Sequence, residues 1–519
     1  PCAYKAAFHK FVGAIQEELR AHDLVDAEGS LLISPAALIT VALVTVFSLY
    51  VIYERITYAL ARRTANGPES LGLPFLGRIV EMVLNPVEFW DKQRAYNTNG
   101  VSINFILGRI VVFVTNPEAC KRIFTSLEDF ALFAHPNAKW LFGKDNLIYL
   151  SKNPHKAVRN FLQPALFNKE AFHKYLAAQV QVINSSILEM MTGRPIDVLP
   201  RLRKMNATAS QEAFVGPYLT EKGEREQLAQ DLITFTQGFL CFPCPLPGTG
   251  LWKAIKAKER IEMTLKEKAR YSWKYIKLGG EPRCALDYVL KGVQTSDTDA
   301  INWNLDDVAT ALMDFLFASQ DATTSALVWA MTLLDSNPAV AQLIRDEVNS
   351  IIDTPYNAHG DQSTFVENLI ERAHKLTVTE KVAIEVLHRR PPVPMVPHLA
   401  RKQIVIDGFT IRKGALVIPS ITGAANNLPE RTSWDKETVD SQFMQNLVFG
   451  AGQHKCPGRN YAIQTIKMFL AMVCVMATQE RKILAKMPYK EQVMYMPTLF
   501  PVESLFVLKP REPLIATNR

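Results

Sequence analysis

The stretch Phe449-Gly-Ala-Gly-Gln-His-Lys-Cys-Pro-Gly-Arg459 decides the fold of this chain. Glycines surround a single cysteine, and an apolar periodic run from Tyr461 to Met472 follows, so the pattern predicts a loop that leads into a helix. The glycines let the backbone curl around the Cys456 sulfur, while loop N–H groups and the helix N-terminus stabilise a thiolate. A buried cysteine alone is usually inert. The combination F-x-x-G-x-H-x-C-x-G is far more specific than any of its parts.

A second informative segment is the periodic run over residues 304–336, which predicts a long helix with acidic residues in its first turn and an end before Pro338. Its centre, Ala318-Ser-Gln-Asp-Ala-Thr-Thr-Ser325, interrupts an apolar run with polar groups that are costly to bury without a purpose. Hydroxyls that bond to carbonyls one turn back would bend this helix and open a pocket. The alternative is a solvated polar stripe, which the apolar flanks disfavour.

A third segment, His155-Lys-Ala-Val-Arg159, places two side chains that can carry positive charge on one helical face. Such a pair is suited to binding a buried carboxylate. An ordinary surface pair is the alternative.

The loop at 449–459 resembles the haem-binding loop of the cytochrome P450 family. The segment 304–336 resembles that family's helix I, and the segment 155–159 resembles its helix C. The resemblance runs from a proline- and glycine-rich linker at 67–77 to the end of the chain. It implies haem b as cofactor, with the Cys456 thiolate as the iron ligand. The other residues implied to bind the cofactor are His454, His155, Arg159, Phe449, Gly450 and Gly458.

This sequence departs from the family pattern in helix C and in helix I. His155 stands where helix C usually has a tryptophan, while Arg159 keeps its place as a propionate ligand. In helix I, Asp321 takes the acidic proton-delivery position of A-G-x-D-T-T, but Ala322 replaces the usual threonine and Thr323 follows. Proton delivery must therefore differ in detail, with Asp321, Thr323 and Ser319 as the expected catalytic residues.

The family's helix K motif, E-x-x-R, is altered here. The glutamate is Glu385, but His388 stands in place of the arginine, and Arg431 matches the arginine of the later meander. Histidine lacks the planar fork of a guanidinium. Loss of one partner of a buried ion pair costs on the order of 3–5 kcal/mol. We therefore expect weaker haem retention than is usual in the family.

Several segments resemble the sterol C-22 desaturases within this family. They are residues 139–148, the helix I centre, Arg390-Pro-Pro-Val-Pro-Met-Val-Pro397 and, in part, residues 494–501. The resemblance implies an enzyme that uses O2 and NADPH-derived electrons from a reductase to introduce a C22=C23 double bond into a sterol. The substrate-contact residues expected by position are Phe133, Phe315, Phe317, Val393, Met395 and Phe500.

Two other functions remain open from the sequence. A sterol 14α-demethylase or another sterol hydroxylase would share the haem, the membrane anchor and the reductase. A non-catalytic haem- or sterol-binding protein is suggested by His388 and by a shortened meander.

The N-terminal region predicts a membrane anchor. Residues 31–53 contain no charged side chain, and about 20 apolar residues suffice to cross a bilayer. Acidic residues precede this segment and Arg55, Arg62 and Arg63 follow it, which places the later domain in the cytosol. A cleaved signal peptide is the weaker alternative. Residues 1–30 are expected to form a luminal segment, either an amphipathic helix or a disordered tail. Residue 1 is proline rather than methionine, so the sequence does not identify the true start of the protein.

The remaining chain is expected to be mainly α with small β-sheets. A basic flank and stiff linker at 54–77 precede a haem-thiolate catalytic domain at 78–519, and endoplasmic reticulum is the expected location. We expect a hairpin from 101–106 and 110–115, a strand pair from 403–406 and 415–418 joined around Asp407-Gly408, and a strand at 505–508.

Composition excludes some other classes. The net charge of +7 is spread over 58 basic and 51 acidic residues without a basic block, so nucleic acid is not an expected partner. The 7 cysteines lack the spacing of a disulfide framework, which indicates a reducing compartment. The close pair Cys241 and Cys244 lacks further ligands for zinc.

Overall fold

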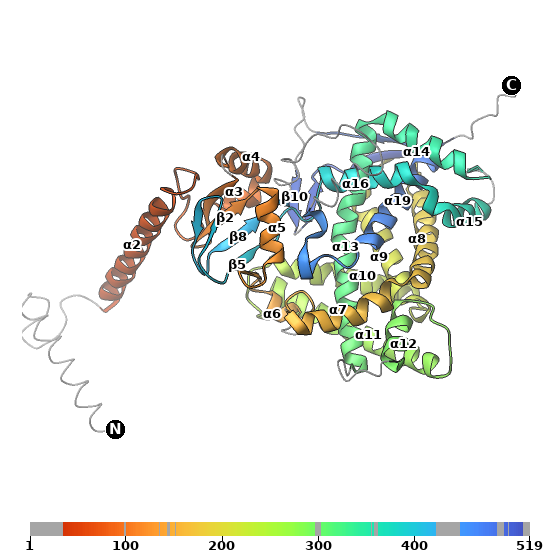
Figure 1. The fold of residues 1–519 in the computed structure, drawn as a ribbon, viewed down its shortest axis with the longest axis horizontal. Coiled ribbons are helices and arrows are strands. Elements are labelled where there is room, and N and C mark those ends of the chain that lie inside the picture. The colour runs from red at the N-terminus through yellow and green to blue at the C-terminus, as the bar shows by residue number, and fades with distance from the viewer. Residues whose placement is uncertain are drawn as a thin grey trace, which may run out of the picture. The chain divides into compact units, whose positions relative to one another are not determined.

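The computed structural model describes residues 35–97, 100–133, 135–142, 146–150, 152–295, 303–353, 355–357, 362–421, 447–484, 493–496 and 498–511. This part of the chain is mainly helical with small sheets (Figure 1), which confirms the predicted fold class. The helices are α2 Pro35–Ala61, α3 Ile79–Leu84, α4 Pro86–Tyr96, α5 Pro117–Thr125, α6 Ala138–Leu141, α7 Lys152–Phe167, α8 Lys169–Met190, α9 Val198–Phe214, α10 Lys222–Gln237, α11 Gly250–Lys277, α12 Ala285–Thr295, α13 Leu305–Ser336, α14 Pro338–Ile351, α15 Ser363–Arg372, α16 Thr377–Arg389 and α19 Arg459–Met476. The strands are β1 Val101–Ile106, β2 Arg109–Val114, β3 Phe130–Leu132, β4 Pro195–Asp197, β5 His398–Ala400, β6 Ile404–Ile406, β7 Phe409–Ile411, β8 Leu416–Pro419, β9 Ala477–Arg481, β10 Val493–Met496, β11 Thr498–Pro501 and β12 Leu505–Pro510.

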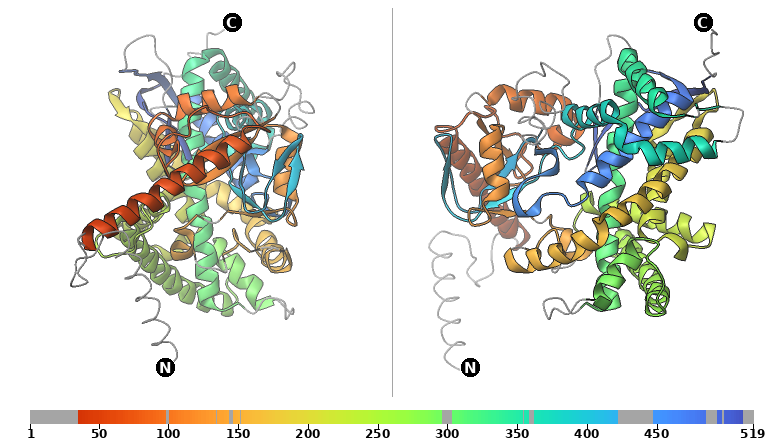
Figure 2. Two further views of the ribbon diagram at one scale, coloured as in Figure 1. Left: turned by 90° about the vertical axis from the view of Figure 1, so that its left-hand side faces the viewer. Right: turned by 45° about the vertical axis from the view of Figure 1, so that its right-hand side comes forward.

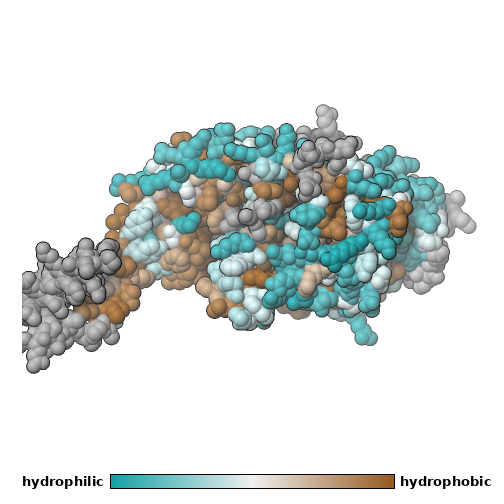
Figure 3. All heavy atoms as spheres, turned by 90° about the horizontal axis from the view of Figure 1, so that it is seen from below, coloured by the Kyte–Doolittle hydropathy of each residue, from teal (hydrophilic) through white to brown (hydrophobic). Residues whose placement is uncertain are grey.

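The chain divides into two compact units, Pro1–Val80 with Ile103–Ile110, and Glu81–Ser102 with Val111–Arg519. The first contains α2, which over Ala37–Ala61 is the one helix of the described residues that is long and apolar enough to cross a membrane. Large apolar side chains are exposed along it, and hydrophobic residues gather where it lies (Figure 3).

The helix α2 extends further than the predicted membrane segment at 31–53, whose first four residues lie outside the described part of the chain. It continues to Ala61 because Glu54 and Arg55 interrupt the apolar run without breaking the helix. Both residues are ordinary helix formers, whereas the Gly67-Pro68 pair that follows cannot continue a helix. At its C-terminal end, helix α2 therefore continues beyond the apolar segment, toward the linker.

The linker at 67–77 contains no named strand, and it packs within the first unit. The backbone N–H of Phe75 donates to the Glu54 carboxylate at 3.2 Å, and the Tyr58 hydroxyl donates to the Pro68 carbonyl at 2.8 Å. Gly77 has a φ of +61°, and a Cβ there would lie 2.0 Å from the Phe105 carbonyl oxygen, so only glycine fits. The end of α2, the linker and residues 103–110 thus form one packed body.

The sheets confirm two of the three predicted strand arrangements. Strands β1 and β2 are neighbours, joined at Leu107-Gly108, where both φ angles are positive as a two-residue hairpin turn requires. Strand β12 pairs with β9 and β4. In the second unit, β8 pairs in parallel with β2 over Val111–Val114 and antiparallel with β5, which pairs with β3.

The predicted pairing of 403–406 with 415–418 is wrong. Strand β6 pairs instead with β7 through a tight turn at Asp407-Gly408, where both φ angles are positive. This turn reverses the chain within two residues, so the partner of β6 is the segment that follows at once. Strand β8 is left to join β2 and β5.

The long helix α13 runs through the middle of the second unit, in contact with α9, α11, α16 and α19 (Figure 2). The Asn304 side chain accepts from the backbone of Asp306 and Asp307, and the Asp307 carboxylate accepts from the Asn304 N–H at 2.9 Å. This capping box and the stop before Pro338 confirm the predicted helix. Its first turns pack into one hydrophobic core and its last turns into another, with the polar centre between them.

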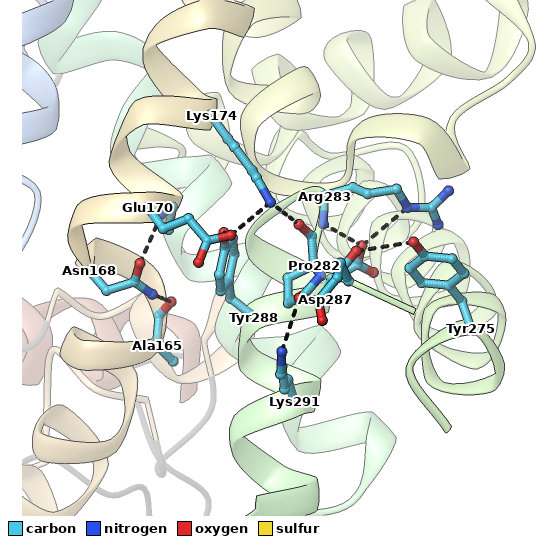
Figure 4. A network of polar contacts seen from close by, with 12 residues as sticks. Ala165, Asn168, Glu170, Lys174, Tyr275, Pro282, Arg283, Asp287, Tyr288 and Lys291 are labelled. Atoms are coloured by element: carbon cyan, nitrogen blue, oxygen red, sulfur yellow. Dashed lines mark hydrogen bonds and ion pairs between the residues drawn. The ribbon is translucent and has the colours of Figure 1, made fainter. Parts of the chain in front are cut away.

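A polar network ties α8 to α12 (Figure 4). Lys174 donates to Glu170 at 2.9 Å and to the Pro282 carbonyl at 2.6 Å, and the Tyr288 hydroxyl donates to the same Glu170 at 2.9 Å. Beside it, the fully buried Asp287 accepts from the backbone of Arg283 at 2.9 Å.

Replacement of Asp287 by alanine should destabilise the fold by about 3 kcal/mol, because the Tyr218 and Ser272 hydroxyls that donate to this carboxylate would lose their acceptor. Thermal melting measures the effect. The control is Lys291→Ala on the same helix, where an exposed ion pair is removed and the change should stay below about 0.5 kcal/mol. Equal melting temperatures for the two variants would contradict the assignment.

Candidate active site

A cavity of about 980 Å³ lies within the second unit, with a mostly apolar lining. Its volume is at the upper end of the range for ligand pockets, which allows a large flat molecule and a second apolar molecule together. All of the residues predicted to bind the cofactor or to act in catalysis line it: Cys456, His454, His155, Arg159, Phe449, Gly450, Gly458, Ser319, Asp321 and Thr323.

The cysteine loop is folded as the glycine pattern indicates. The Cys456 N–H donates to the Phe449 carbonyl at 2.8 Å, and Gly450 and Gly452 both have a φ of +68°. A Cβ on Gly452 would lie 2.9 Å from the Phe124 carbonyl oxygen, so the loop can pass this backbone only with glycine. Helix α19 begins at Arg459, three residues after Cys456.

The Cys456 side chain is accessible from the cavity while protein surrounds it on its other sides. Burial raises the pKa of the Cys456 thiol, and a hydrogen bond from the Gly458 backbone together with the positive charge of Arg159 opposes this rise. A cation bound to the sulfur would offset the remaining cost of a buried thiolate.

Basic side chains from α7 and from the cysteine loop meet in the same cavity. Arg159 donates to the Gln453 carbonyl at 3.0 Å, and the His155 and His454 ring centroids are 4.3 Å apart. Burial first, and then the neighbouring His454 and Arg159, lower the pKa of His155 to about 4. The Nδ1 atom of His155 is buried without a hydrogen-bond partner, so an anionic group here would complete its bonding and neutralise Arg159.

The polar centre of α13 makes the hydroxyl–carbonyl bonds that the sequence predicts. Ser319 donates to the Leu316 carbonyl at 2.8 Å, and Thr324 donates to the Gln320 carbonyl at 2.8 Å. Helix α13 continues through these residues without a break. Asn206 of α9 also donates to the carbonyls of Ser319 and Gln320, at 2.7 and 2.8 Å. A single asparagine within a helix carries no pattern, so sequence reasoning missed it.

Asp321 has a partner that the sequence did not reveal. Arg203 of α9 donates to its carboxylate at 3.2 Å, and both side chains are mostly buried. Burial raises the pKa of Asp321, and Arg203 opposes this rise. Ala322 and Thr323 line the cavity beside it.

Three of the six expected substrate contacts line the cavity, namely Phe315, Phe317 and Val393. The other three lie elsewhere. Phe500 is fully buried with Arg203 over its ring, Met395 forms a bridge with Ser420, and the backbone of Phe133 donates to the Pro397 carbonyl. Apolar character alone did not separate core packing from cavity lining.

Glu385 has a partner one turn along its own helix. Arg389 donates to its carboxylate at 2.7 Å, because residues four apart on a helix are neighbours. The Arg389 side chain is 58% exposed, so this pair is weaker than a buried one. Arg431 lies outside the described residues.

A cysteine in a large, mostly apolar cavity, beside basic groups that suit carboxylates, is the arrangement that a haem held through sulfur requires. The described residues contain no group of three or more side chains placed to hold a metal ion. The residues present fit a haem, because Cys456 would supply one ligand to its iron and the basic cluster would bind its propionates.

Comparison with known proteins agrees. The family model for cytochrome P450 matches residues 68–475. Cytochrome P450 710A3 of Arabidopsis thaliana is 30% identical over 493 residues, which cover 92% of this chain and 97% of the relative. C-22 sterol desaturase erg5 of Aspergillus fumigatus is 28% identical, covering 89% and 92%. The solved structure of retinoic acid-bound cyanobacterial CYP120A1 superposes with a TM-score of 0.71 at 20% identity, covering 86% of this chain and all of that one.

This chain belongs to the cytochrome P450 family. It is an oxidoreductase with haem-thiolate iron as its cofactor, and a redox partner supplies its electrons.

Replacement of His388 by arginine should raise the melting temperature and the haem content per protein, because it places a guanidinium three residues after Glu385, where the family pairs these groups. Absorbance at the Soret band and thermal melting measure the two effects. An unchanged haem content would contradict the expectation of weak retention.

The matched control is Arg389→Ala, which removes the partly exposed partner of Glu385. It should cost less than about 1 kcal/mol.

Proposed function

We propose that this cytochrome P450 is a sterol C-22 desaturase, which introduces a C22=C23 double bond into a sterol side chain with O2 and electrons from an NADPH-cytochrome reductase. The observation that carries the proposal is similarity over nearly the whole chain to proteins named C-22 sterol desaturase, from Aspergillus fumigatus at 28% identity and Saccharomyces cerevisiae at 26%. The mostly apolar cavity supports it, because a sterol offers almost only hydrocarbon surface.

In this proposal Cys456 would bind the haem iron, and His155, His454 and Arg159 would bind the propionates. Haem-thiolate iron, when bound, supplies the activation of O2 that removal of hydrogen from an unactivated C–H bond requires. The apolar lining excludes water from the reacting carbons. Phe315, Phe317 and Val393 are the proposed substrate contacts.

Asp321 is the proposed proton donor of the cavity. Its raised pKa, caused by burial, keeps a proton on its carboxyl to a higher pH than for an exposed aspartate. Arg203 orients the carboxyl, and Asn206 occupies the nearby helix carbonyls. Ala322 offers no hydroxyl, so the proton passes through water or the neighbouring Thr323, with Ser319 as a further polar group.

The proposed location is the endoplasmic reticulum membrane. Helix α2 is the anchor, residues 1–30 are luminal, and the catalytic domain at 78–519 is cytosolic. Arginines at the end of α2, including Arg62 and Arg63, favour this orientation.

Replacement of Cys456 by alanine should abolish the red-shifted Soret band of the reduced, carbon-monoxide-bound protein, because this band requires a thiolate ligand. Turnover of a sterol with a saturated side chain should be lost with it. The control Cys244→Ala should keep both, since this cysteine lies outside the cavity lining. Normal spectrum and turnover in Cys456→Ala would overturn the proposal.

The product of the unaltered enzyme decides between related functions. The enzyme is incubated with NADPH, the reductase and a sterol that has a saturated side chain. Mass spectrometry should then find a product with an unsaturated side chain. A hydroxylated or 14α-demethylated sterol would instead identify a hydroxylase or demethylase, and NADPH-independent binding without any product would identify a binding protein.

Asp321→Asn should lower kcat by about 100-fold while KM changes little, because the amide keeps the shape of the side chain but cannot donate an acid proton. Steady-state kinetics measure the split. Asp346→Asn, at an exposed position on α14, is the control and should behave as wild type. If kcat is retained in Asp321→Asn, another group delivers the proton.

A further inference from the structure

Besides Asp321, the aspartate Asp314 of α13 lines the cavity, and it has no part in the chemistry described above. Asp314 precedes Asp321 by seven residues, so it lies on nearly the same face of the helix, about 10 Å away along the axis. Its neighbours in sequence are apolar, and it interrupts a run that otherwise packs into a hydrophobic core. Burial of a carboxyl at such a position is costly unless it is bonded.

The carboxyl of Asp314 is held from one side only. The side-chain amide of Asn146 donates to its Oδ2 at 2.6 Å. Asn146 is itself fixed, since it is 2% exposed and its Oδ1 accepts from the Ile148 backbone at 2.8 Å. The other oxygen of Asp314, Oδ1, is buried without a hydrogen-bond partner. The Oδ1 atom of Asp314 can therefore form a further strong hydrogen bond with a ligand.

The surroundings of Asp314 keep this carboxyl neutral. Burial raises its pKa to about 8; Asn146 and the positive charge of Lys258 oppose this rise, and Glu262 adds to it. Lys258 and Glu262 lie on α11 and pair with each other at 3.5 Å, and Tyr149 is a further titratable neighbour. A neutral carboxyl both donates and accepts hydrogen bonds, which matches an alcohol.

We propose that Asp314, fixed by Asn146, is the anchor for the single hydroxyl group of an otherwise apolar substrate. This deepens the proposed function and rests on it. A sterol carries its 3-hydroxyl and its side chain at opposite ends of a rigid ring system. A hydroxyl bound at Asp314 therefore directs the side chain away from this end of the cavity and selects the carbons that meet the catalytic groups.

Access to the Oδ1 atom needs only a small movement. Asp314 is partly exposed, and its exposed surface lines the cavity. The terminal torsion of an aspartate is broad, so a modest rotation presents Oδ1 to a ligand while Oδ2 keeps its hydrogen bond from Asn146. The competing explanation, a purely structural carboxyl, leaves the second oxygen without a purpose.

The test compares two probes on the haem-loaded enzyme: a side-chain-saturated 3-hydroxysterol and its 3-deoxy hydrocarbon. Dissociation constants come from the change in the haem absorption band during titration. The wild type should bind the hydroxysterol about tenfold more tightly. Asp314→Leu should bring the ratio close to one, while Asp314→Asn, which keeps a donor and an acceptor, should retain a preference. The control is Thr310→Val, which removes another hydrogen-bonding group of α13 that lines the cavity and should leave the ratio unchanged.

The carbon-monoxide spectrum shows whether each variant is folded and loaded. If Asp314→Leu is not, Asp314→Ala takes its place, and it too should bring the ratio close to one. A preference that survives in Asp314→Leu, or equal binding of both probes by the wild type, overturns the anchor even if the sterol is desaturated. A preference that depends on Asp314 supports the anchor even if the product is oxidised at another carbon, in which case the proposed desaturation alone fails.

Discussion

The sulfur of Cys456, open to the cavity and enclosed by protein on its other sides, is the constraint on which the rest of the structure depends. A thiolate cannot be enclosed by protein unless positive charge and N–H groups compensate it, and burial alone raises the pKa of this thiol. The glycines of the loop allow the close backbone approach, Arg159 supplies charge from α7, and α19 begins directly after the loop. These features are distant in sequence, and their convergence on one atom explains why the cavity lies here.

The helix α13 carries the second requirement, a polar stretch inside an apolar protein. Each end of the helix is embedded in a separate hydrophobic core, which holds it in place although its centre contributes little apolar packing. The helix α9 offsets the cost of that centre, because Asn206 takes up two of its carbonyls and Arg203 pairs with Asp321. The polar residues therefore remain available to a ligand without destabilising the helix.

Sequence patterns were sufficient where a feature is local. The cysteine loop, the capped helix after Asn304 and the hairpin at Leu107-Gly108 are each encoded within a few residues, and all were predicted. Features that depend on tertiary contacts were not. The burial of Phe500 beneath Arg203 and the role of Asn206 follow from which elements meet in space. The pairing of β6 with β7 is a local feature that was nevertheless missed, because the Asp407-Gly408 turn was expected to join 403–406 to a later segment. Asp314 left one usable signal, a lone acid in an apolar helical run.

The compact body formed by α2, the linker and residues 103–110 has a mechanical consequence. Glu54 and Tyr58 bind the linker to the end of the helix, and Gly77 seats that linker against the Phe105 backbone. A helix joined to its domain by a loose tether can tilt or sink without moving anything else. Here the end of α2 and the Leu107 turn belong to one packed body, so a tilt of α2 in the proposed membrane would carry the turn with it.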